Sequence, residues 1–167
     1  MSSLITAQMQ AALGARLGHQ VSYPVSASDI RRWATAIYWP EPPPEKYLSA
    51  EEAWLTAPED MNPFAWAVLS SDTPPHAGDV PGHDPDRTEK SIGIEGPGLA
   101  KQLNGGLKIE YGVPMRVGDT ISSERILAGY TEREGRLGRM LFTTMTDTWT
   151  NQENQTVKRT ELTLIRY

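Results

Sequence analysis

The chain has 167 residues, which suits one folding domain, and carries a net charge of -5 at neutral pH. This acidic balance excludes a broad nucleic-acid or anionic-membrane surface, because phosphate binding requires clustered Lys and Arg. The chain contains no Cys, which excludes a disulfide framework, a thiolate nucleophile and a Cys-based metal site. The sequence shows neither a signal-peptide pattern nor a long apolar run, so we expect a cytoplasmic protein without a membrane span.

The clearest helix signal lies in the first half of the chain. A weaker apolar periodicity predicts a short helix within residues 4–17, and residues 20–25 are typical of a brief strand. Ser26 and Asp29 have the spacing of a capping box, so we expect a helix to begin at about Ala27. The apolar residues that follow at helical spacing and predict one buried face are Ile30, Trp33, Ala34 and Ile37.

A rigid, aromatic turn follows this helix, with the sequence Tyr38-Trp39-Pro40-Glu41-Pro42-Pro43-Pro44-Glu45-Lys46. Proline fixes φ and favours extended geometry in the residue before it, so the helix ends here and the turn has few conformations to lose. Such a segment is suited to the wall of a pocket. It contains no Asp, His, Ser or Cys, and therefore lacks the usual catalytic side chains.

An apolar segment further along the chain predicts a buried helix. A cap at about Ser49 predicts a short helix that carries Trp54 and Leu55. Pro63 then opens the apolar run 63–69, which predicts a helix packed on all sides. Residues 70–90 are rich in Pro, Gly and Asp and predict a long flexible loop, for which a lid and a solvated acidic loop are both open interpretations.

The second half of the chain has the period-two alternation of β-strands. Four segments predict an antiparallel meander of about four strands: 107–113, 120–131, 139–150 and 156–167. One face of such a sheet is normally buried, so the helix predicted at 63–69 is expected to fill it. The sequence thus predicts one α+β domain over residues 1–167, in which a curved antiparallel sheet wraps round a central helix in a hot-dog fold.

Several local motifs, taken in order, resemble the N-terminal, FAS1-like dehydratase branch of the MaoC-like dehydratase and hydratase family. The resemblance covers roughly residues 14–167 and rests on Ser28–Ala34 before the proline turn, Ala57-Pro58, Asn104–Tyr111, Val117–Thr120 and Thr163–Arg166. It implies a hot-dog dimer that adds water to a 2-enoyl-CoA or removes it from a 3-hydroxyacyl thioester. Coenzyme A would belong to the substrate, and no further cofactor is expected.

The resemblance also implies a catalytic motif, Gly-Asp-x-Asn-Pro-x-His, whose Asp and His exchange protons with a bound water. A backbone N–H at a helix end stabilises the thioester oxyanion. When Pro42 is matched to the Pro of this motif, Trp39 replaces the Asp, Glu41 replaces the Asn and Pro44 replaces the His. The expected role is therefore a non-catalytic subunit that shapes the substrate pocket, while a partner hot-dog subunit supplies Asp and His.

We expect the acyl-CoA substrate to contact Tyr38, Trp39, Asn62, Phe64, Asn104 and Gly105. A pocket without catalytic groups leaves room for a bulky acyl group, such as a steroid side chain. Two alternatives remain open at this point: a self-sufficient homodimeric hydratase or thioesterase that uses Glu41 and Glu45, and an acyl-CoA-binding protein without turnover.

Two other groups of polar residues have simpler interpretations. The metal-ligand types His76, Asp79, His83, Asp84 and Asp86 have no recognised ligand spacing, so no metal site is expected. The basic residues Lys101, Lys108 and Arg116 could meet CoA phosphates, although isolated basic side chains are usually solvated.

Overall fold

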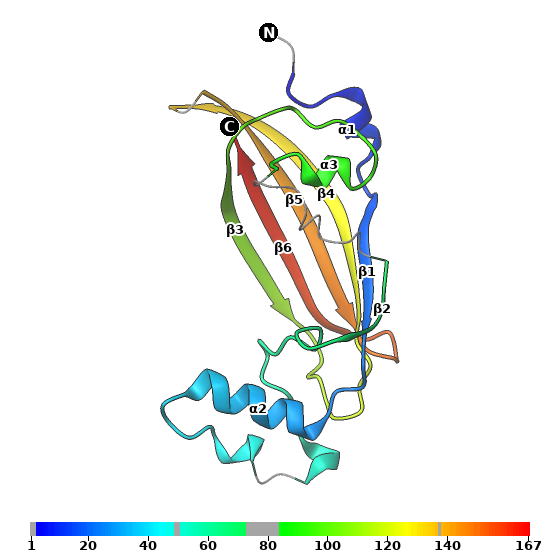
Figure 1. The fold of residues 1–167 in the computed structure, drawn as a ribbon, viewed down its shortest axis with the longest axis vertical. Coiled ribbons are helices and arrows are strands. Elements are labelled where there is room, and N and C mark those ends of the chain that lie inside the picture. Colours follow the sequence, from blue (N-terminus) through cyan, green and yellow to red (C-terminus); the bar gives the residue numbers. More distant parts are fainter. Residues whose placement is uncertain (1–2, 49–50, 73–83, 137) are drawn as a thin grey trace.

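The structure is a computed structural model that describes residues 3–48, 51–72, 84–136 and 138–167. Six strands form one antiparallel sheet in the order β2-β1-β4-β5-β6-β3 (Figure 1). The strands are β1 (Arg16–Ser22), β2 (Val68–Ser71), β3 (Gln102–Tyr111), β4 (Ser122–Gly135), β5 (Gly138–Thr150) and β6 (Thr156–Arg166). The helices are α1 (Ala7–Ala11), α2 (Ala27–Tyr38) and α3 (Arg87–Lys90), with 3-10 turns η1 (Glu45–Tyr47) and η2 (Glu52–Trp54).

The sheet combines a local meander with two strands that pair over long distances. Strands β4, β5 and β6 are joined in sequence by short turns, as predicted. The expectation that β3 continues this meander was wrong, since β3 pairs with β6 at one edge of the sheet. The chain after β3 does not form a hairpin but crosses the end of the sheet, where Gly118 N donates to Val25 O at 2.8 Å.

Helix α2 begins as the capping signal predicts. The Ser26 hydroxyl accepts a hydrogen bond from Asp29 N at 3.0 Å, so it pairs one of the free N–H groups of the first turn. Ile30 and Ala34 are buried, whereas Ile37 is exposed, so the buried face is narrower than the periodicity indicates. We refer to residues 26–48 and 51–55, which contain α2, η1 and η2, as the α2 arm.

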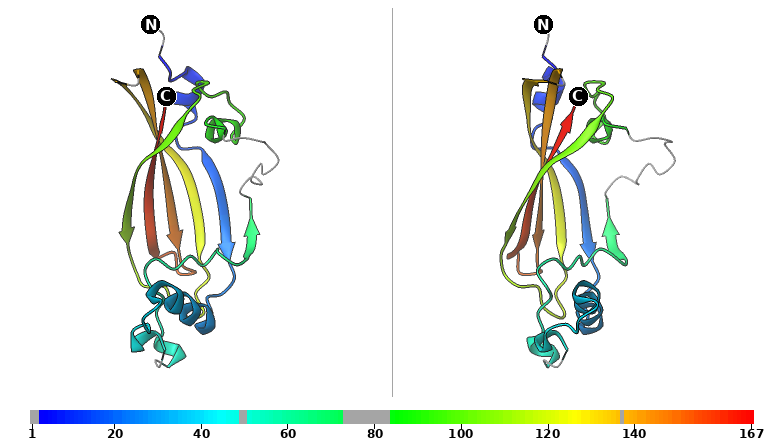
Figure 2. Two further views of the ribbon diagram at one scale, coloured as in Figure 1. Left: turned by 60° about the vertical axis from the view of Figure 1, so that its left-hand side comes forward. Right: turned by 90° about the vertical axis from the view of Figure 1, so that its left-hand side faces the viewer.

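The prediction of a helix at residues 63–69 was wrong. Residues 62–67 form turns, in which the Asn62 side chain accepts a hydrogen bond from Phe64 N at 3.0 Å, and Val68 opens strand β2. Strand β2 pairs with β1, which leaves Leu69 exposed rather than packed on all sides. The long helix of the structure is instead α2, which lies beyond one end of the sheet (Figures 1 and 2).

The main hydrophobic core lies where the end of the sheet meets the α2 arm. Its buried members come from α2 and the residue pair before it, from η1, from the 55–61 and 115–121 segments and from the ends of β5 and β6: Val25, Ala27, Ile30, Ala34, Tyr47, Leu55, Ala57, Met61, Met115, Ile121, Trp149 and Val157. Burial of apolar area stabilises such a cluster by about 25 cal/mol per Å². The core therefore fixes the arm against the sheet and defines the walls of the hollows between them.

A buried charged network holds α3 on the other half of the sheet. The guanidinium of Arg166, on β6, donates to both carboxylate oxygens of Glu89 at 2.7 Å and to Thr143 Oγ1 at 2.7 Å. Arg166 Nη1 also donates to Asp86 Oδ1 at 3.1 Å, and the Tyr130 hydroxyl donates to Glu89 at 2.7 Å. Burial, with this last hydrogen bond, raises the pKa of Tyr130. Side chains from β4, β5 and β6 thus fix a helix of only four residues.

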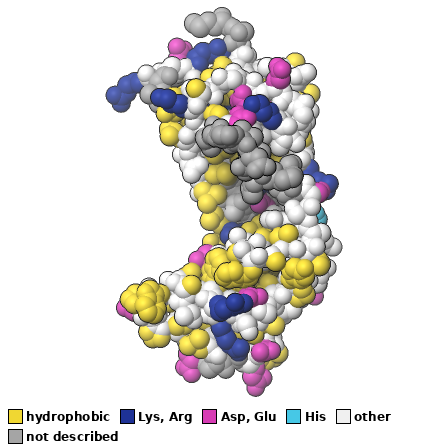
Figure 3. Space-filling view, viewed as in Figure 1, with side chains coloured by type: hydrophobic (Ala, Val, Ile, Leu, Met, Phe, Trp, Pro, Cys, Tyr) yellow, Lys and Arg dark blue, Asp and Glu magenta, His cyan; other side chains and the backbone are white. Residues whose placement is uncertain are grey.

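Strand β3 is exposed along almost its whole length. Its large apolar side chains, Leu103, Leu107, Ile109 and Tyr111, are all exposed. Figure 3 shows a hollow between the body of the sheet and the α2 arm, with hydrophobic side chains along it. An edge strand with this much apolar surface is a typical template for pairing with another chain.

Candidate functional site

A cavity of about 290 Å³ lies at the end of the sheet that faces the α2 arm. We call it the sheet-end pocket. Its walls come from residues 57–61, from the crossing segment after β3 and from the ends of β5 and β6: Ala57, Pro58, Glu59, Met61, Tyr111, Gly112, Val113, Pro114, Met115, Trp149, Val157 and Lys158. Apolar walls with a few polar groups are typical of a small-molecule site.

The register of the sheet places Tyr111, Lys158 and Trp149 side by side. Tyr111 on β3 and Trp149 on β5 both lie directly opposite Lys158 on β6. Residues directly opposite in antiparallel strands point to the same face, so the three side chains form one row across the sheet. Lys158 Nζ lies 4.5 Å from the ring centroid of Trp149 and 5.9 Å from that of Tyr111.

Lys158 is half-buried in this row. Burial lowers its pKa, and the more distant carboxylates of Asp60 and Asp147 act in the opposite direction. Among the residues that the structure describes, no carboxylate comes within 4.0 Å of its ammonium, which contacts aromatic faces instead. A desolvated cation in a cavity is a candidate functional group.

Trp149 forms the deep wall of the pocket. Its side chain is 9% exposed and makes an edge-to-face contact with Phe64 at a centroid distance of 5.2 Å. Its indole Nε1 is buried and has no hydrogen-bond partner in the described part of the chain. A buried N–H normally has an acceptor, so this indole nitrogen is an unsatisfied polar group behind the pocket wall.

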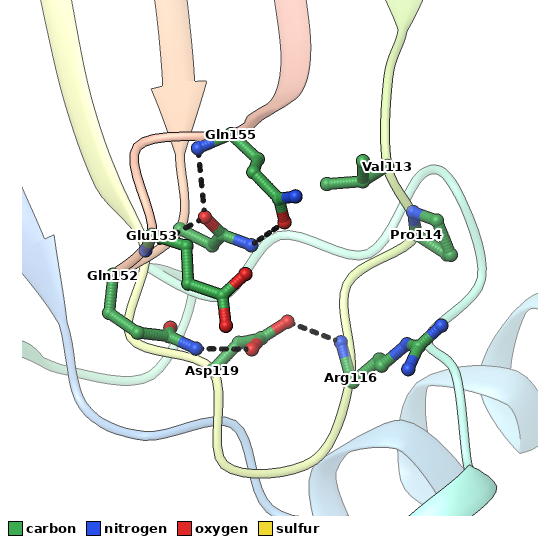
Figure 4. Close-up of a pocket in the computed structure, with 8 residues that line it drawn as sticks. Val113, Pro114, Arg116, Asp119, Gln152, Glu153 and Gln155 are labelled. Carbon is green, nitrogen blue, oxygen red and sulfur yellow. Dashed lines mark hydrogen bonds between the residues drawn. The ribbon is translucent and has the colours of Figure 1, made fainter.

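A second, polar hollow of about 320 Å³ lies on the other side of Val113 and Pro114 (Figure 4). Several of its polar groups are paired with one another. Asp119 accepts hydrogen bonds from Arg116 N at 2.7 Å and from Gln152 Nε2 at 2.9 Å. The Asn151 side-chain oxygen accepts from Glu153 N and Gln155 N, both at 3.0 Å. These bonds join the crossing segment to the β5–β6 turn, so this hollow serves to hold one wall of the sheet-end pocket in place.

The predicted substrate-contacting residues occupy three separate regions. Phe64 lies against Trp149, and Asn62 caps the turn beside it. Tyr38 and Trp39 lie at the C-terminal end of α2, where Tyr38 contacts the ring of Tyr47 at 6.2 Å and Trp39 is 78% exposed. Asn104 and Gly105 lie at the other end of β3, where Asn104 pairs with Leu164.

The structure therefore brings only part of the predicted set to the sheet-end pocket. Asn104 and Gly105 face the half of the sheet that holds α3, which places them away from Trp149. Trp149, Lys158 and Tyr111 carry no site motif in the sequence. Trp149 and Lys158 lie on the consecutive strands β5 and β6, whereas Tyr111 joins them only through the long-range pairing of β3 with β6.

The remaining candidates have local partners or lie outside the described residues. Lys108 pairs with Glu110 at 2.6 Å, Lys101 lies 5.8 Å from the Tyr167 ring, and Arg116 borders the polar hollow. Asp84 pairs with Lys90 at 2.7 Å, and Asp86 belongs to the Arg166 network. His76, Asp79 and His83 lie outside the described residues. Within the described ranges, no group of three or more His, Asp or Glu side chains could hold a metal ion.

Comparison with known protein families gives the class of this chain. The family model of the FAS1-like, dehydratase domain region matches residues 11–160, so the chain belongs to this family. This match confirms the FAS1-like dehydratase branch that the sequence motifs resemble. A comparison with proteins of curated function gives no match.

Solved structures confirm the fold. The chain resembles the MaoC-like dehydratase from Rhodospirillum rubrum, with 19% identity, a TM-score of 0.52 and coverage of 93% of this chain and 92% of that one. It also resembles the ChsH1-ChsH2 complex from Mycobacterium tuberculosis, with 16% identity, a TM-score of 0.62 and coverage of 96% and 88%. The chain also resembles the R-hydratase PhaJ1 from Pseudomonas aeruginosa, with 14% identity and a TM-score of 0.52. This likeness covers 92% of this chain and 81% of that one. The curved antiparallel sheet is thus the predicted α+β hot-dog fold.

None of the helices in the described part of the chain has the length and apolar character that crossing a bilayer requires.

Proposed function

We propose that this chain is the non-catalytic, pocket-forming subunit of a heteromeric MaoC-like enoyl-CoA hydratase. The observation that carries the proposal is the composition of the turn after α2. Trp39 and Pro44 stand where the family motif has Asp and His, and both are exposed on the α2 arm. Neither side chain can accept or donate a proton at neutral pH, so the acid and base must come from another subunit.

The exposed edge of β3 supports a partner subunit. A second hot-dog chain could pair with its free backbone groups and cover Leu107 and Ile109, which otherwise remain in contact with water. Two structurally similar proteins are described as complexes, ChsH1-ChsH2 and HadBC, both from Mycobacterium tuberculosis. The open edge of β3 is the observation that supports a heteromeric state for this chain.

The proposed reaction adds water to the double bond of a 2-enoyl-CoA. The partner's carboxylate and imidazole would orient the water and move its protons, while a backbone N–H stabilises the oxyanion. This chain would bind the acyl group against Met61, Val113 and Trp149 and exclude bulk water from it. Because no catalytic side chains fill its half of the assembly, a bulky acyl group, such as a steroid side chain, is the proposed substrate. We place this reaction in the cytoplasm and expect no cofactor beyond the coenzyme A of the substrate.

The test is a hydration assay of each subunit and of their mixture. The catalytic partner is a hot-dog subunit with an intact Asp and His motif from the same organism, and the substrates are crotonyl-CoA and a 2-enoyl-CoA with a bulky acyl group. We expect no turnover by this chain alone and, on mixing, a gain of at least about tenfold in kcat/KM for the bulky substrate. Full activity of this chain without the partner would overturn the proposal.

Two matched variants separate the proposal from its rivals. Replacement of the partner's motif Asp by Asn should abolish activity, whereas Glu41→Gln combined with Glu45→Gln in this chain should leave it unchanged. Loss of activity in the Gln variant would favour the self-sufficient enzyme, which the exposure of both Glu side chains does not support. Acyl-CoA binding without turnover in any mixture would favour a binding protein.

A further inference from the structure

We propose that Lys158 anchors an anionic group in the sheet-end pocket, where it binds a carboxylate or a phosphate of the ligand. The identification of that ligand as an acyl-CoA thioester rests on the proposed function. The anion site itself rests on the geometry of Lys158 and its neighbours. The chemistry is shared by two sources, a carboxylate on the acyl chain and the phosphates of coenzyme A.

The position of the ammonium is fixed by three strands. Because Lys158 lies between Trp149 and Tyr111 in the sheet register, its aliphatic stem is held in the row and its charged end lies over the Trp149 ring. An aromatic face attracts a cation but offers its N–H groups no lone pair. The ammonium is therefore positioned in the pocket with no oxygen acceptor among the described residues.

The Lys158 ammonium is the donor that a ligand oxygen can reach in this pocket. Lys158 and Trp149 both line the cavity of about 290 Å³. The indole Nε1 of Trp149 is buried, so the aromatic face beneath the ammonium is the part of Trp149 that contacts it. A partly desolvated ammonium without an oxygen acceptor costs free energy, so this arrangement favours a ligand that brings acceptors.

The nearby carboxylates decide between an anion site and an internal ion pair. Asp147 is engaged elsewhere, because it accepts hydrogen bonds from Ser123 Oγ at 2.7 Å and from Arg125 Nη2 at 3.2 Å. Glu59 lines the pocket and is exposed, and Asp60 is exposed beside it. If Lys158 serves to pair with Glu59, removal of either charge changes ligand binding in the same direction. If Lys158 binds an anion, Glu59 repels that ligand, so removal of Glu59 strengthens ligand binding while removal of Lys158 weakens it.

The experiment measures binding by calorimetry to the full chain and to its complex with the catalytic subunit. The four ligands are pentanoyl-CoA, glutaryl-CoA and the corresponding two pantetheine thioesters, which lack the phosphates. We expect Lys158→Met to weaken binding of the anion-bearing ligand by about tenfold to a hundredfold. Lys90→Met is the matched control, because Lys90 is exposed on α3 and paired with Asp84, and it should bind as the wild type does.

The pattern across the ligands identifies the source of the anion. If Lys158→Met loses affinity only for the two glutaryl thioesters, the anion is the acyl carboxylate. If it loses affinity only for the two CoA thioesters, the anion is a phosphate. Glu59→Gln should tighten binding of the same ligands. Three results would overturn the proposal: equal binding by Lys158→Met and wild type, equal weakening of all four ligands, or weakening by Glu59→Gln.

A second readout does not depend on thioesters. Amine labelling of the chain, followed by mass spectrometry, should show that glutarate or pyrophosphate protects Lys158 and leaves Lys90 unprotected. Protection without any thioester binding would preserve the anion site and remove the proposed hydratase function. Absence of protection, together with absence of ligand discrimination, would remove the anion site while the hydration assay could still succeed.

Discussion

Arg166 is the side chain whose loss should cost this fold most. It is almost fully buried, as is Glu89, and the two form a bidentate pair with both distances at 2.7 Å. Breaking a buried pair on one side leaves an uncompensated charge, so Arg166→Met should lower the free energy of unfolding by about 3–5 kcal/mol. Urea denaturation measures this change.

The matched control is Lys90→Met on the same short helix. Lys90 is exposed and its partner Asp84 is partly exposed, so loss of this pair should leave the free energy of unfolding almost unchanged. A double variant with Met at both 89 and 166 should recover part of the stability, because it removes both charges of the bidentate pair and leaves Asp86 as the only carboxylate without its Arg166 partner. Equal costs for Arg166→Met and Lys90→Met would show that the network is not a major source of stability.

Lys158 gives a pH dependence with a defined sign. Burial lowers its pKa below the ordinary value of 10.5, so the folded state holds this proton less tightly than the unfolded state. The folded state is therefore penalised while Lys158 is charged, and the penalty is relieved as pH rises through the lowered pKa towards 10.5. The groups that face Lys158 are Asp60, Glu59, Asp147 and Tyr111.

We therefore expect the stability of wild type relative to Lys158→Met to increase between neutral and alkaline pH. Denaturant unfolding of both proteins at several pH values measures this difference, which cancels titrations common to both. A difference that stays constant over this range, or that falls, would contradict the assigned direction of the Lys158 pKa.

At the scale of elements, the cap of α2 controls the attachment of the arm. Ser26→Ala removes the acceptor for Asp29 N, so it should lower the free energy of unfolding by about 1 kcal/mol. Ser26→Thr retains a hydroxyl at this position and should restore most of that loss. Denaturation monitored by tryptophan fluorescence reports on both variants. Equal losses in Ala and Thr variants would indicate that packing, rather than capping, is the dominant effect at residue 26.

The elements that sequence reasoning identified correctly have local signals. Helix α2 has a cap and a periodicity within a dozen residues, and the β4–β5–β6 meander has alternating strands joined by short turns. Residues 63–69 were misassigned because a short apolar run has no period that separates helix from strand, and its Val68–Ser71 end pairs with β1. The pairing of β3 with β6 is a long-range choice that no local pattern specifies.

The same distinction explains the candidate site. The replacement of the family's Asp and His by Trp39 and Pro44 is visible in the sequence itself. The row of Tyr111, Lys158 and Trp149 is not visible there, because it depends on the register of β3 and β5 against β6. Asn104 and Gly105 were placed with the site by their motif, yet the extended β3 carries them to the other end of the sheet.

At the scale of the whole molecule, the open edge of β3 predicts where the partner binds. Leu107 is 59% exposed on this strand, so Leu107→Lys would place a charge inside an apolar interface. We expect the variant to weaken association with the catalytic subunit by at least about tenfold, as measured by sedimentation or calorimetry. Ser70→Lys, on the opposite edge strand β2, should have no such effect. Equal weakening by both variants would locate the interface elsewhere.

The strand order also has a consequence for how the chain reaches its folded state. Strand β1 depends on β4, where Arg16 pairs with Ile126, and β3 depends on β6, where Gln102 pairs with Arg166. During synthesis, β1 cannot pair with β4, and β3 cannot pair with β6, until these later strands have been made. Strands β4, β5 and β6 can pair among themselves. Pulse-labelled hydrogen exchange should find amides of β4–β6 protected first. Until that meander exists, the apolar surfaces of β1 and β3 remain uncovered on the growing chain.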